Sequence, residues 1–506
     1  MPPRYWWLKR ILATAGVLLI VVVCSHWLWG VAAERNLQKK IAQLRAAGQP
    51  VLPEDFEQPA VPDEENAAYY IEQACSALVL PTKPGEMYVD DITDNPIVLI
   101  RYPDVAARAL ARNRAALLFL ARAEQARACN WRSLSGAPVR GGKLARQWAG
   151  TRKLATLACA AAYSAHQQGN DTGTIEALHQ AFRVGECTGR DAGLMGALVR
   201  AATDDLAARG VEYVAPELRV ASGRSWSAES ARAPRDRVRD LIARLTDEQA
   251  ASEAWRYAMQ TDRADALQNA RLLCDGTTPV SSLSGNPPAP LLDSLARIVM
   301  YPRWLFQTAT MLDEFADYAE LASVSTWPEA RQRLGLSLNW GFQWPRDPVK
   351  TALHPFDTSI YGRAFAGHLG SVAKKRMAAT VLAIRLYELD HDRRPETLEE
   401  LVPVYLSHLP IDPFAAGGGV LGYLPHADVP VVYSVGRDGV DDRGQDVLDS
   451  AGNRDSDRSD RSFRLDRRDF QHYPSLFEPA ASQPTSDESV EQNPGVENEG
   501  GEPDER

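Results

Sequence analysis

An apolar run near the N-terminus constrains this chain more than any other feature of its sequence. The run extends from Ile11 to Gly30, follows a basic leader at 1–10, and is bracketed by Trp7 and Trp27. At about 1.5 Å per residue, a helix of this length measures roughly 30 Å, the thickness of the hydrocarbon core of a bilayer. Tryptophan favours both membrane interfaces. The sequence therefore predicts a single transmembrane helix at 11–30.

A cleaved signal peptide is the alternative to this anchor, because Val31 and Ala33 are small residues suited to a cleavage site. We favour the anchor, since the run is longer than the usual core of a signal peptide. Basic residues lie on both sides of the run, so their count does not decide the orientation. The short leader is the easier part to leave in the cytoplasm. We expect a single-pass protein of the cell inner membrane with an extracytoplasmic C-terminal domain.

Long segments with helical periodicity, rich in Ala, Leu and Arg, follow the apolar run. The segments predicted to be helical are 64–79, 104–129, 143–168, 172–188, 192–216, 227–273 and 290–323. Glycine and proline at 275–289 predict a break before the last of them. The sequence thus predicts an α-helical ectodomain at 31–340 that contains helical hairpins. Packed hairpins often present a concave surface, so we expect a protein partner to bind this domain.

The charge of the chain is concentrated at its C-terminus. The formal net charge is −10, but nine acidic residues and one basic residue follow from Glu478, so the remainder carries only about −2. A near-neutral folded part is not the basic surface that binds nucleic acid, and we expect no nucleic-acid partner. The tail at 473–506 has too little apolar surface to offset the entropy of ordering, so we predict that it is disordered.

Local motifs for catalysis are missing from the sequence. There is no HExxH metal motif, no GxSxG nucleophile elbow and no glycine-rich phosphate loop. The cluster Asp390, His391 and Asp392 ends a helical segment. This position favours a solvated helix cap over an acid–base site. The six cysteines occur singly, which favours buried free thiols. We therefore favour a non-catalytic membrane-tethered scaffold or interaction protein. The alternative is an envelope hydrolase whose site is assembled from distant residues.

The C-terminal third has a different pattern from the helical middle. After an irregular connection at 341–362, the segment 363–472 opens with a long helix that ends near Leu389, and Leu382 and Leu386 lie on its apolar face. A short helix at "PETLEEL" and two β-prone runs, "GGGVLGYLP" and "VPVVYSVG", follow. This order predicts a small α+β module. The chain as a whole is predicted to be mainly α.

Three motifs in this module follow one another in a moderately specific order. They are "LYELDHDRRPETLEELV", "DPF" and "VVYSVGRDGVDD", and the match that they define covers about 363–446. In this order they resemble the soluble domain of the major pseudopilin of bacterial type II secretion. The chain also resembles a group of uncharacterised membrane-anchored bacterial proteins that have this module after a helical region. The resemblance implies a link to secretion or to pilus-like machinery, and a calcium loop.

The loop after the second β-prone run contains clustered carboxylates. Calcium takes six to eight oxygen ligands, and this loop offers carboxylates and free backbone carbonyls. The predicted ligands are Ser434 and Val435 through their carbonyls and Asp438, Asp441 and Asp442 through their side chains. The alternative is a solvated acidic turn in which Arg437 and Arg443 offset the acids as weak surface pairs.

Overall fold

The structure is a computed structural model of the chain. This structure describes residues 5–56, 59–79, 102–131, 142–189, 193–221, 231–281, 287–335, 359–445, 447 and 459–466. All of these belong to one unit, Met1–Arg468. The leader residues 1–4, nearly all of the predicted connection at 341–362 and the predicted tail at 473–506 lie outside the described residues.

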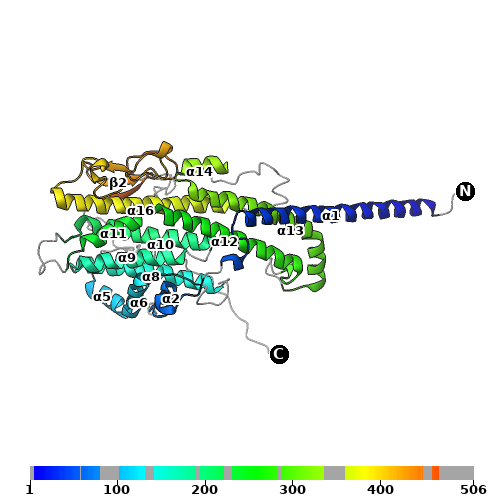
Figure 1. The fold of residues 1–506 in the computed structure, drawn as a ribbon, viewed down its shortest axis with the longest axis horizontal. Coiled ribbons are helices and arrows are strands. Elements are labelled where there is room, and N and C mark those ends of the chain that lie inside the picture. The colour runs from blue at the N-terminus through cyan, green and yellow to red at the C-terminus, as the bar shows by residue number, and fades with distance from the viewer. Residues whose placement is uncertain are drawn as a thin grey trace, which may run out of the picture. The chain divides into compact units, whose positions relative to one another are not determined.

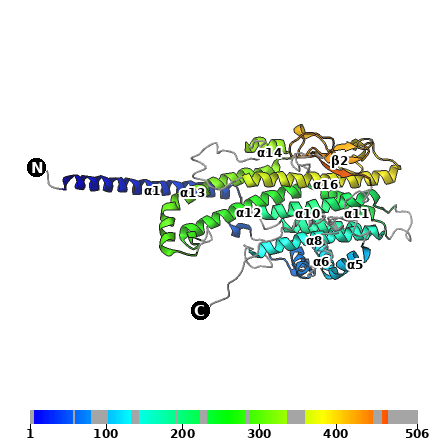
Figure 2. The same ribbon diagram turned by 180° about the vertical axis from the view of Figure 1, so that it is seen from behind.

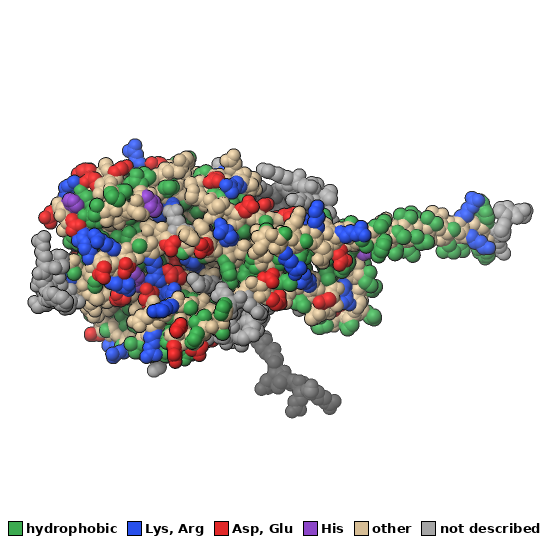
Figure 3. Space-filling view, viewed as in Figure 1, with side chains coloured by type: hydrophobic (Ala, Val, Ile, Leu, Met, Phe, Trp, Pro, Cys, Tyr) green, Lys and Arg blue, Asp and Glu red, His purple; other side chains and the backbone are tan. Residues whose placement is uncertain are grey.

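The N-terminal run forms one continuous helix, α1 (Trp6–Ala46). None of residues 11–29 is buried, and among the described residues α1 is the one helix long and apolar enough to cross a membrane. Green apolar side chains cover this part of the helix in Figure 3. The last part of α1 is different, because Ala33, Leu37 and Ile41 are buried against α13. A helix with these two halves can join a membrane span to a folded body.

The middle of the chain is helical, as the sequence predicts. Its first helices are α2 (Ala67–Ser76), α5 (Pro103–Arg112), α6 (Arg114–Gln125), α8 (Gly142–Gln167), α9 (Asp171–Thr188) and α10 (Gly193–Val214). The next are α11 (Arg235–Leu245), α12 (Glu248–Asp275), α13 (Pro290–Glu320) and α14 (Trp327–Leu334). Short 3-10 turns follow or separate some of them. Helices α8 and α9 form the predicted hairpin, and Asn170 caps α9 by accepting a hydrogen bond from Gly173 N at 3.0 Å.

The C-terminal segment begins with the long helix α16 (Ser359–His391), on which Leu382 and Leu386 are buried as predicted. The strands β1 (Gly422–Leu424), β2 (Val431–Ser434) and β3 (Arg461–Arg464) form an antiparallel sheet in the order β1-β2-β3. The third strand was not predicted. Figures 1 and 2 show the sheet lying along α16. The fold is therefore mainly α with one small sheet.

The largest hydrophobic core joins the middle helices to this C-terminal segment. It contains buried residues from α8, α9 and α10, such as Leu157 and Leu178, together with Leu382 of α16 and Val432 of β2. Helix α16 packs against α10 and α11 along its length (Figures 1 and 2). All six cysteines are free, and Cys129, Cys159 and Cys187 are buried, so the expectation of buried free thiols is confirmed.

Candidate functional site

Charged side chains of α10 and α16 meet inside the protein. Lys374 pairs with Asp205, and the neighbouring Lys375 lies 3.5 Å from Asp204. Arg200, one turn before Asp204, lies 3.7 Å from the same carboxylate. Two adjacent lysines on one helix therefore face two adjacent aspartates on the other, and this double pair fixes α16 to α10.

A small cavity adjoins this double pair, where α12 also approaches. Its polar lining includes Arg200, Asp204, His368, Ser371 and Lys375. The Ser371 Oγ is buried and has no hydrogen-bond partner among the described residues. The cavity measures about 10 Å³, close to the smallest volume that holds one water molecule. It admits no substrate.

Burial sets the ionisation of the groups around this cavity. It lowers the pKa of Lys375, and the charge of Asp204 offsets only part of that effect. Burial also lowers the pKa of His368 to about 3, helped by the nearby charges of Lys375 and Arg200. His368 is therefore neutral at pH 7, and its ring packs against Trp255 and Phe365. The arrangement is that of a packed structural histidine.

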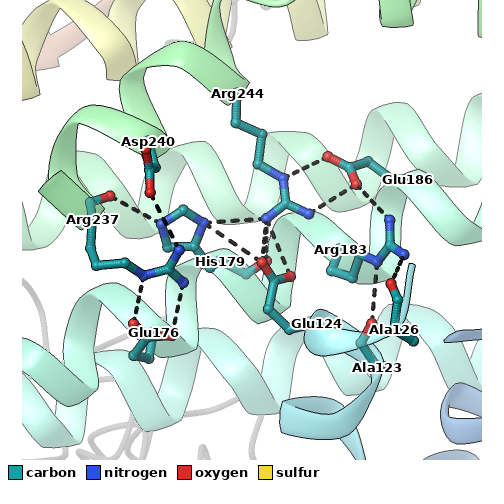
Figure 4. A network of polar contacts seen from close by, with 10 residues as sticks. All are labelled: Ala123, Glu124, Ala126, Glu176, His179, Arg183, Glu186, Arg237, Asp240 and Arg244. Atoms are coloured by element: carbon teal, nitrogen blue, oxygen red, sulfur yellow. Dashed lines mark hydrogen bonds and ion pairs between the residues drawn. The ribbon is translucent and has the colours of Figure 1, made fainter. Parts of the chain in front are cut away.

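A second polar network joins α6, α9 and α11, and Figure 4 shows its side chains converging from the three helices. Arg244 of α11 is at its centre. It donates to both oxygens of Glu186, at 2.6 and 2.9 Å, and its Nη1 donates to Glu124 at 3.0 Å. The same Nη1 donates to the backbone oxygen of His179 at 3.1 Å. At the other end of α11, Arg237 donates hydrogen bonds to both carboxylate oxygens of Glu176, at 2.8 and 3.0 Å.

The pKa values of the two glutamates that Arg244 bridges are shifted in opposite directions. Burial would raise the pKa of Glu186, but hydrogen bonds from Arg244 and its charge outweigh burial and hold that pKa at about 2. Glu124 has the opposite outcome, because burial raises its pKa more than Arg244 lowers it. Burial also lowers the pKa of His179 to about 4. With an arginine that bridges two carboxylates and a neutral histidine, the network serves to join three helices.

The predicted calcium ligands at the end of β2 lie beside a buried aspartate that the sequence analysis did not single out as a site residue. Asp412, in the "DPF" motif, accepts hydrogen bonds from Ser434 Oγ at 2.7 Å and from Val435 N at 2.8 Å. It also accepts one from Phe414 N at 3.0 Å. The Asp-Pro-Phe corner therefore holds the end of the strand in place. Only the side-chain oxygen of Ser434 and the amide of Val435 are engaged by Asp412, and their carbonyls are the groups predicted to bind calcium.

The three predicted carboxylate ligands lie in the exposed loop that follows. Asp438 accepts a hydrogen bond from Val440 N at 3.1 Å, and Asp441 accepts one from Arg443 N at 2.9 Å. Asp460, just before β3, lies close enough to Asp442 and Asp441 for their charges to add to burial and raise its pKa to about 6. Asp446 lies outside the described residues.

A calcium site at this loop stays a prediction. Among the residues that the structure describes, no three or more His, Cys, Asp or Glu side chains are grouped closely enough to hold a metal ion. A site here would need backbone carbonyls as well as carboxylates. The crowding of Asp441, Asp442 and Asp460 is the feature that a bound cation would relieve.

Calcium is expected to raise the thermal unfolding midpoint of the full chain. A dissociation constant of about 0.1 mM gives a stabilisation of about 1.4 kcal/mol at 1 mM calcium. Thermal unfolding in EDTA and in calcium measures it, and the double variant Asp441→Ala, Asp442→Ala is the control. No calcium-dependent rise in the wild-type midpoint, or an equal rise in the control, would leave this loop as a solvated acidic turn.

The cluster Asp390, His391 and Asp392 lies exposed at the end of α16 and makes specific contacts there. Asp390 pairs with Arg235 at the start of α11 and accepts a hydrogen bond from Tyr405 Oη at 2.7 Å. The ring of His391 stacks on Tyr387 with 4.0 Å between centroids. Asp392 has a positive φ of 54° and ends the helix. The three residues are exposed where the helix ends, as predicted for a solvated cap, and Asp390 in addition ties α16 to α11.

An open depression lies where α1 ends. It has a volume of about 610 Å³ and is lined by Arg45, Gln49, Phe56, Tyr257 and Gln260, among others. We call it the juxta-anchor depression. The rings of Phe56 and Tyr257 pack edge to face there, with 5.4 Å between centroids. Its size is in the range of binding sites.

Comparisons of the chain with protein-family models, with curated proteins and with solved structures found no significant match.

Proposed function

We propose that the protein is a non-catalytic, membrane-tethered scaffold or interaction protein of the bacterial cell envelope. One observation carries the proposal: a single helix, α1, is exposed and apolar in its first part and buried against the folded body in its last part. The tether and the body are therefore one rigid piece. A protein whose only task was to stay near the membrane would need no such joint.

The contacts at this joint support a rigid connection. Lys40 near the end of α1 pairs with Asp313 of α13 and donates to Ala309 O at 2.9 Å. Arg263 of α12 is almost fully buried and donates to Gln49 Oε1 at 2.7 Å and to Pro50 O at 2.8 Å, just after α1 ends. These contacts fix the orientation of the body relative to α1.

The nature of the polar clusters favours a scaffold over the alternative, an envelope hydrolase. The cavity beside Lys375 has perturbed groups, as a catalytic site would, but it holds about one water molecule. The juxta-anchor depression has the volume of a binding site, and its lining supports protein recognition through aromatic, amide and arginine groups. We propose that a protein partner binds there. The likeness of the C-terminal segment to a pseudopilin suggests secretion or pilus-like machinery as its setting.

The topology of α1 gives the first test. Alkaline phosphatase fused after Gly48 is expected to be active, because we propose that the folded body lies outside the cytoplasm in a single-pass inner-membrane protein. The mature chain is expected to begin at Met1 or Pro2, as determined by mass spectrometry. A mature N-terminus at Glu34 would mean that the run is cleaved and would contradict the tether.

Photo-crosslinking in intact membranes tests the binding role. A photoreactive residue at Gln260, in the juxta-anchor depression, is expected to give a discrete crosslinked product. The same residue at the exposed Arg239 of α11 is the control and is expected to give none. Equal products from both positions, or none from Gln260, would contradict partner binding at the depression.

A further inference from the structure

The first part of α13 turns its apolar face outward. Five of its side chains are large, apolar and 61 to 83% exposed: Leu291, Leu292, Leu295, Ile298 and Val299. Their spacing places them on one side of a helix. In a helix that packs on a soluble body this side would face the core. Here it faces away from it.

The polar residues of the same segment lie on the opposite side and are bound within the protein. Asp293 accepts hydrogen bonds from Ser281 N and Ala289 N, at 2.8 and 2.9 Å. Arg297 donates to Ser294 Oγ at 3.5 Å. The polar side is thus already satisfied by the chain, which leaves the apolar side to meet something else.

A proline brings this segment to the end of the membrane span. Pro302 lies inside α13 and has no N–H for the carbonyl of Ile298, four residues earlier. Instead, His26 of α1 is hydrogen-bonded to that carbonyl, with 2.9 Å between its Nε2 and the oxygen of Ile298. Gly30 lies against Pro302 and Tyr301, which leave room for a hypothetical Cβ at 3.6 and 3.8 Å. Figures 1 and 2 show the first part of α13 turned across the direction of α1.

These contacts set the level of the segment relative to the membrane. Residues 26–30 form the end of the apolar run, and Trp27 and Trp29 are exposed there, as in an interfacial aromatic belt. A helix that crosses the direction of a span at this level lies along the membrane surface. Its outward apolar side then continues the apolar surface of α1.

We propose that residues 290–301 form an interfacial helix that inserts its apolar face into the surface of the lipid bilayer beside α1. This proposal rests on the proposed membrane tether. With one helix across the bilayer and one along it, the protein has two contacts with the membrane instead of one. The body is then held at a fixed tilt and rotation, which a single span does not provide. Apolar burial in the interface supplies the binding free energy.

Fluorescence quenching by spin-labelled lipids tests the proposal. The full chain, with serine at Cys24, Cys75 and Cys274, is labelled with the fluorophore NBD at single introduced cysteines and reconstituted into vesicles of phosphatidylcholine and phosphatidylglycerol. Leu295→Cys reports on the interfacial face, and Leu18→Cys reports on the span. Arg239→Cys on α11, which Figure 1 shows remote from α1, is the aqueous control.

We expect the label at 295 to be quenched several-fold more than the label at 239, and more by a shallow than by a deep spin label. The label at 18 should be quenched more by the deep one. If the label at 18 is quenched while the label at 295 is quenched no more than the label at 239, the proposal of an interfacial helix is wrong and the proposed tether stands. If 18 is not quenched, the tether itself is wrong. Labelling at Arg297→Cys, on the opposite side of the helix, should give weaker quenching than at 295, and equal quenching would overturn the assigned face.

Discussion

Replacing Arg244 by methionine is expected to lower the free energy of unfolding by about 3 kcal/mol at pH 7. The guanidinium bridges Glu186 and Glu124, whose side chains are only 28 and 17% exposed. Methionine keeps most of the volume and the helix propensity, but it leaves two carboxylates in a poorly hydrated site. Breaking a buried pair costs about 3 to 5 kcal/mol, and the partial exposure of these groups favours the lower end. Urea unfolding of the detergent-purified chain, followed by tryptophan fluorescence, measures the change.

Two further variants separate the lost charge from lost packing. Arg239→Met changes an exposed arginine of the same helix and is expected to alter stability by less than about 0.5 kcal/mol. Adding Glu186→Gln and Glu124→Gln to Arg244→Met removes the uncompensated charges and is expected to restore part of the loss. If the triple variant is less stable than Arg244→Met alone, the network does not act through charge.

The same network gives a pH dependence. The pKa of Glu186 is about 2 in the folded chain, against an ordinary value of 4.5. A lowered pKa means that the stabilisation is complete above about pH 4.5 and is lost as the pH falls toward 2. The Arg244→Met variant is expected to show a smaller loss of stability over that range than the wild type.

Helix interiors could be predicted from the sequence, whereas some helix ends could not. The predicted helices at 143–168, 172–188 and 290–323 match α8, α9 and α13 within a few residues. The segment 104–129 is helical as predicted but forms two helices, because the chain breaks at Asn113 between α5 and α6. There the Asn113 side chain accepts a hydrogen bond from Val79 N at 2.8 Å and donates one to Ala109 O at 3.1 Å. A bond to a residue 34 positions away leaves no trace in local periodicity.

The predicted helical segment at 227–273 likewise contains two helices, α11 and α12. Helix α11 ends at Leu245, and Asp247 caps α12 by accepting a hydrogen bond from Ala250 N at 3.0 Å. This boundary had a local indication, since an aspartate between two apolar-periodic segments is a common N-cap. The third strand was missed because "RSFR" is short and lies apart from the other two.

The polar clusters could not be predicted as pairs, although their members could have been noticed. The doublets Asp204-Asp205 and Lys374-Lys375 both interrupt apolar helical segments, and charged residues on a buried side need partners. Their separation in sequence is about 170 residues, so only the fold identifies the match. The acidic loop at 438–442 was conspicuous in the sequence, yet Asp412, the buried carboxylate that holds the end of the preceding strand, was hidden in a short corner motif.

Asp262 is expected to make the protein less stable as the pH rises from about 4 to 7. Burial raises the pKa of this carboxyl to about 7, and the charge of Asp265 adds to the effect. The group faces the start of α10, where the amide of Leu194 donates to it, and Tyr361 Oη of α16 donates to it at 3.3 Å. A Cβ on Gly193 would lie only 1.7 Å from its Oδ1, so the backbone approaches it closely and keeps water out.

The sign follows from proton linkage. In the folded chain Asp262 binds its proton up to about pH 7, whereas in the unfolded chain it loses the proton near its ordinary value of 3.8. Between these values the folded state holds more protons, so stability falls as the pH rises. Each unit between the two pKa values is worth about 1.4 kcal/mol, which gives a loss on the order of 4 kcal/mol by pH 7 to 8.

Asp262→Asn is expected to remove this loss, because asparagine keeps the shape and an acceptor for Leu194 N but carries no charge. The variant should be more stable than the wild type at pH 8 by an amount on the order of 4 kcal/mol and nearly equal to it at pH 4. Urea midpoints measured across pH 4 to 8 give the comparison, with Glu253→Gln on the exposed side of the same helix as the matched control. A variant that is less stable than the wild type at pH 8 would mean that the charged carboxylate itself holds α10 and α16 to α12.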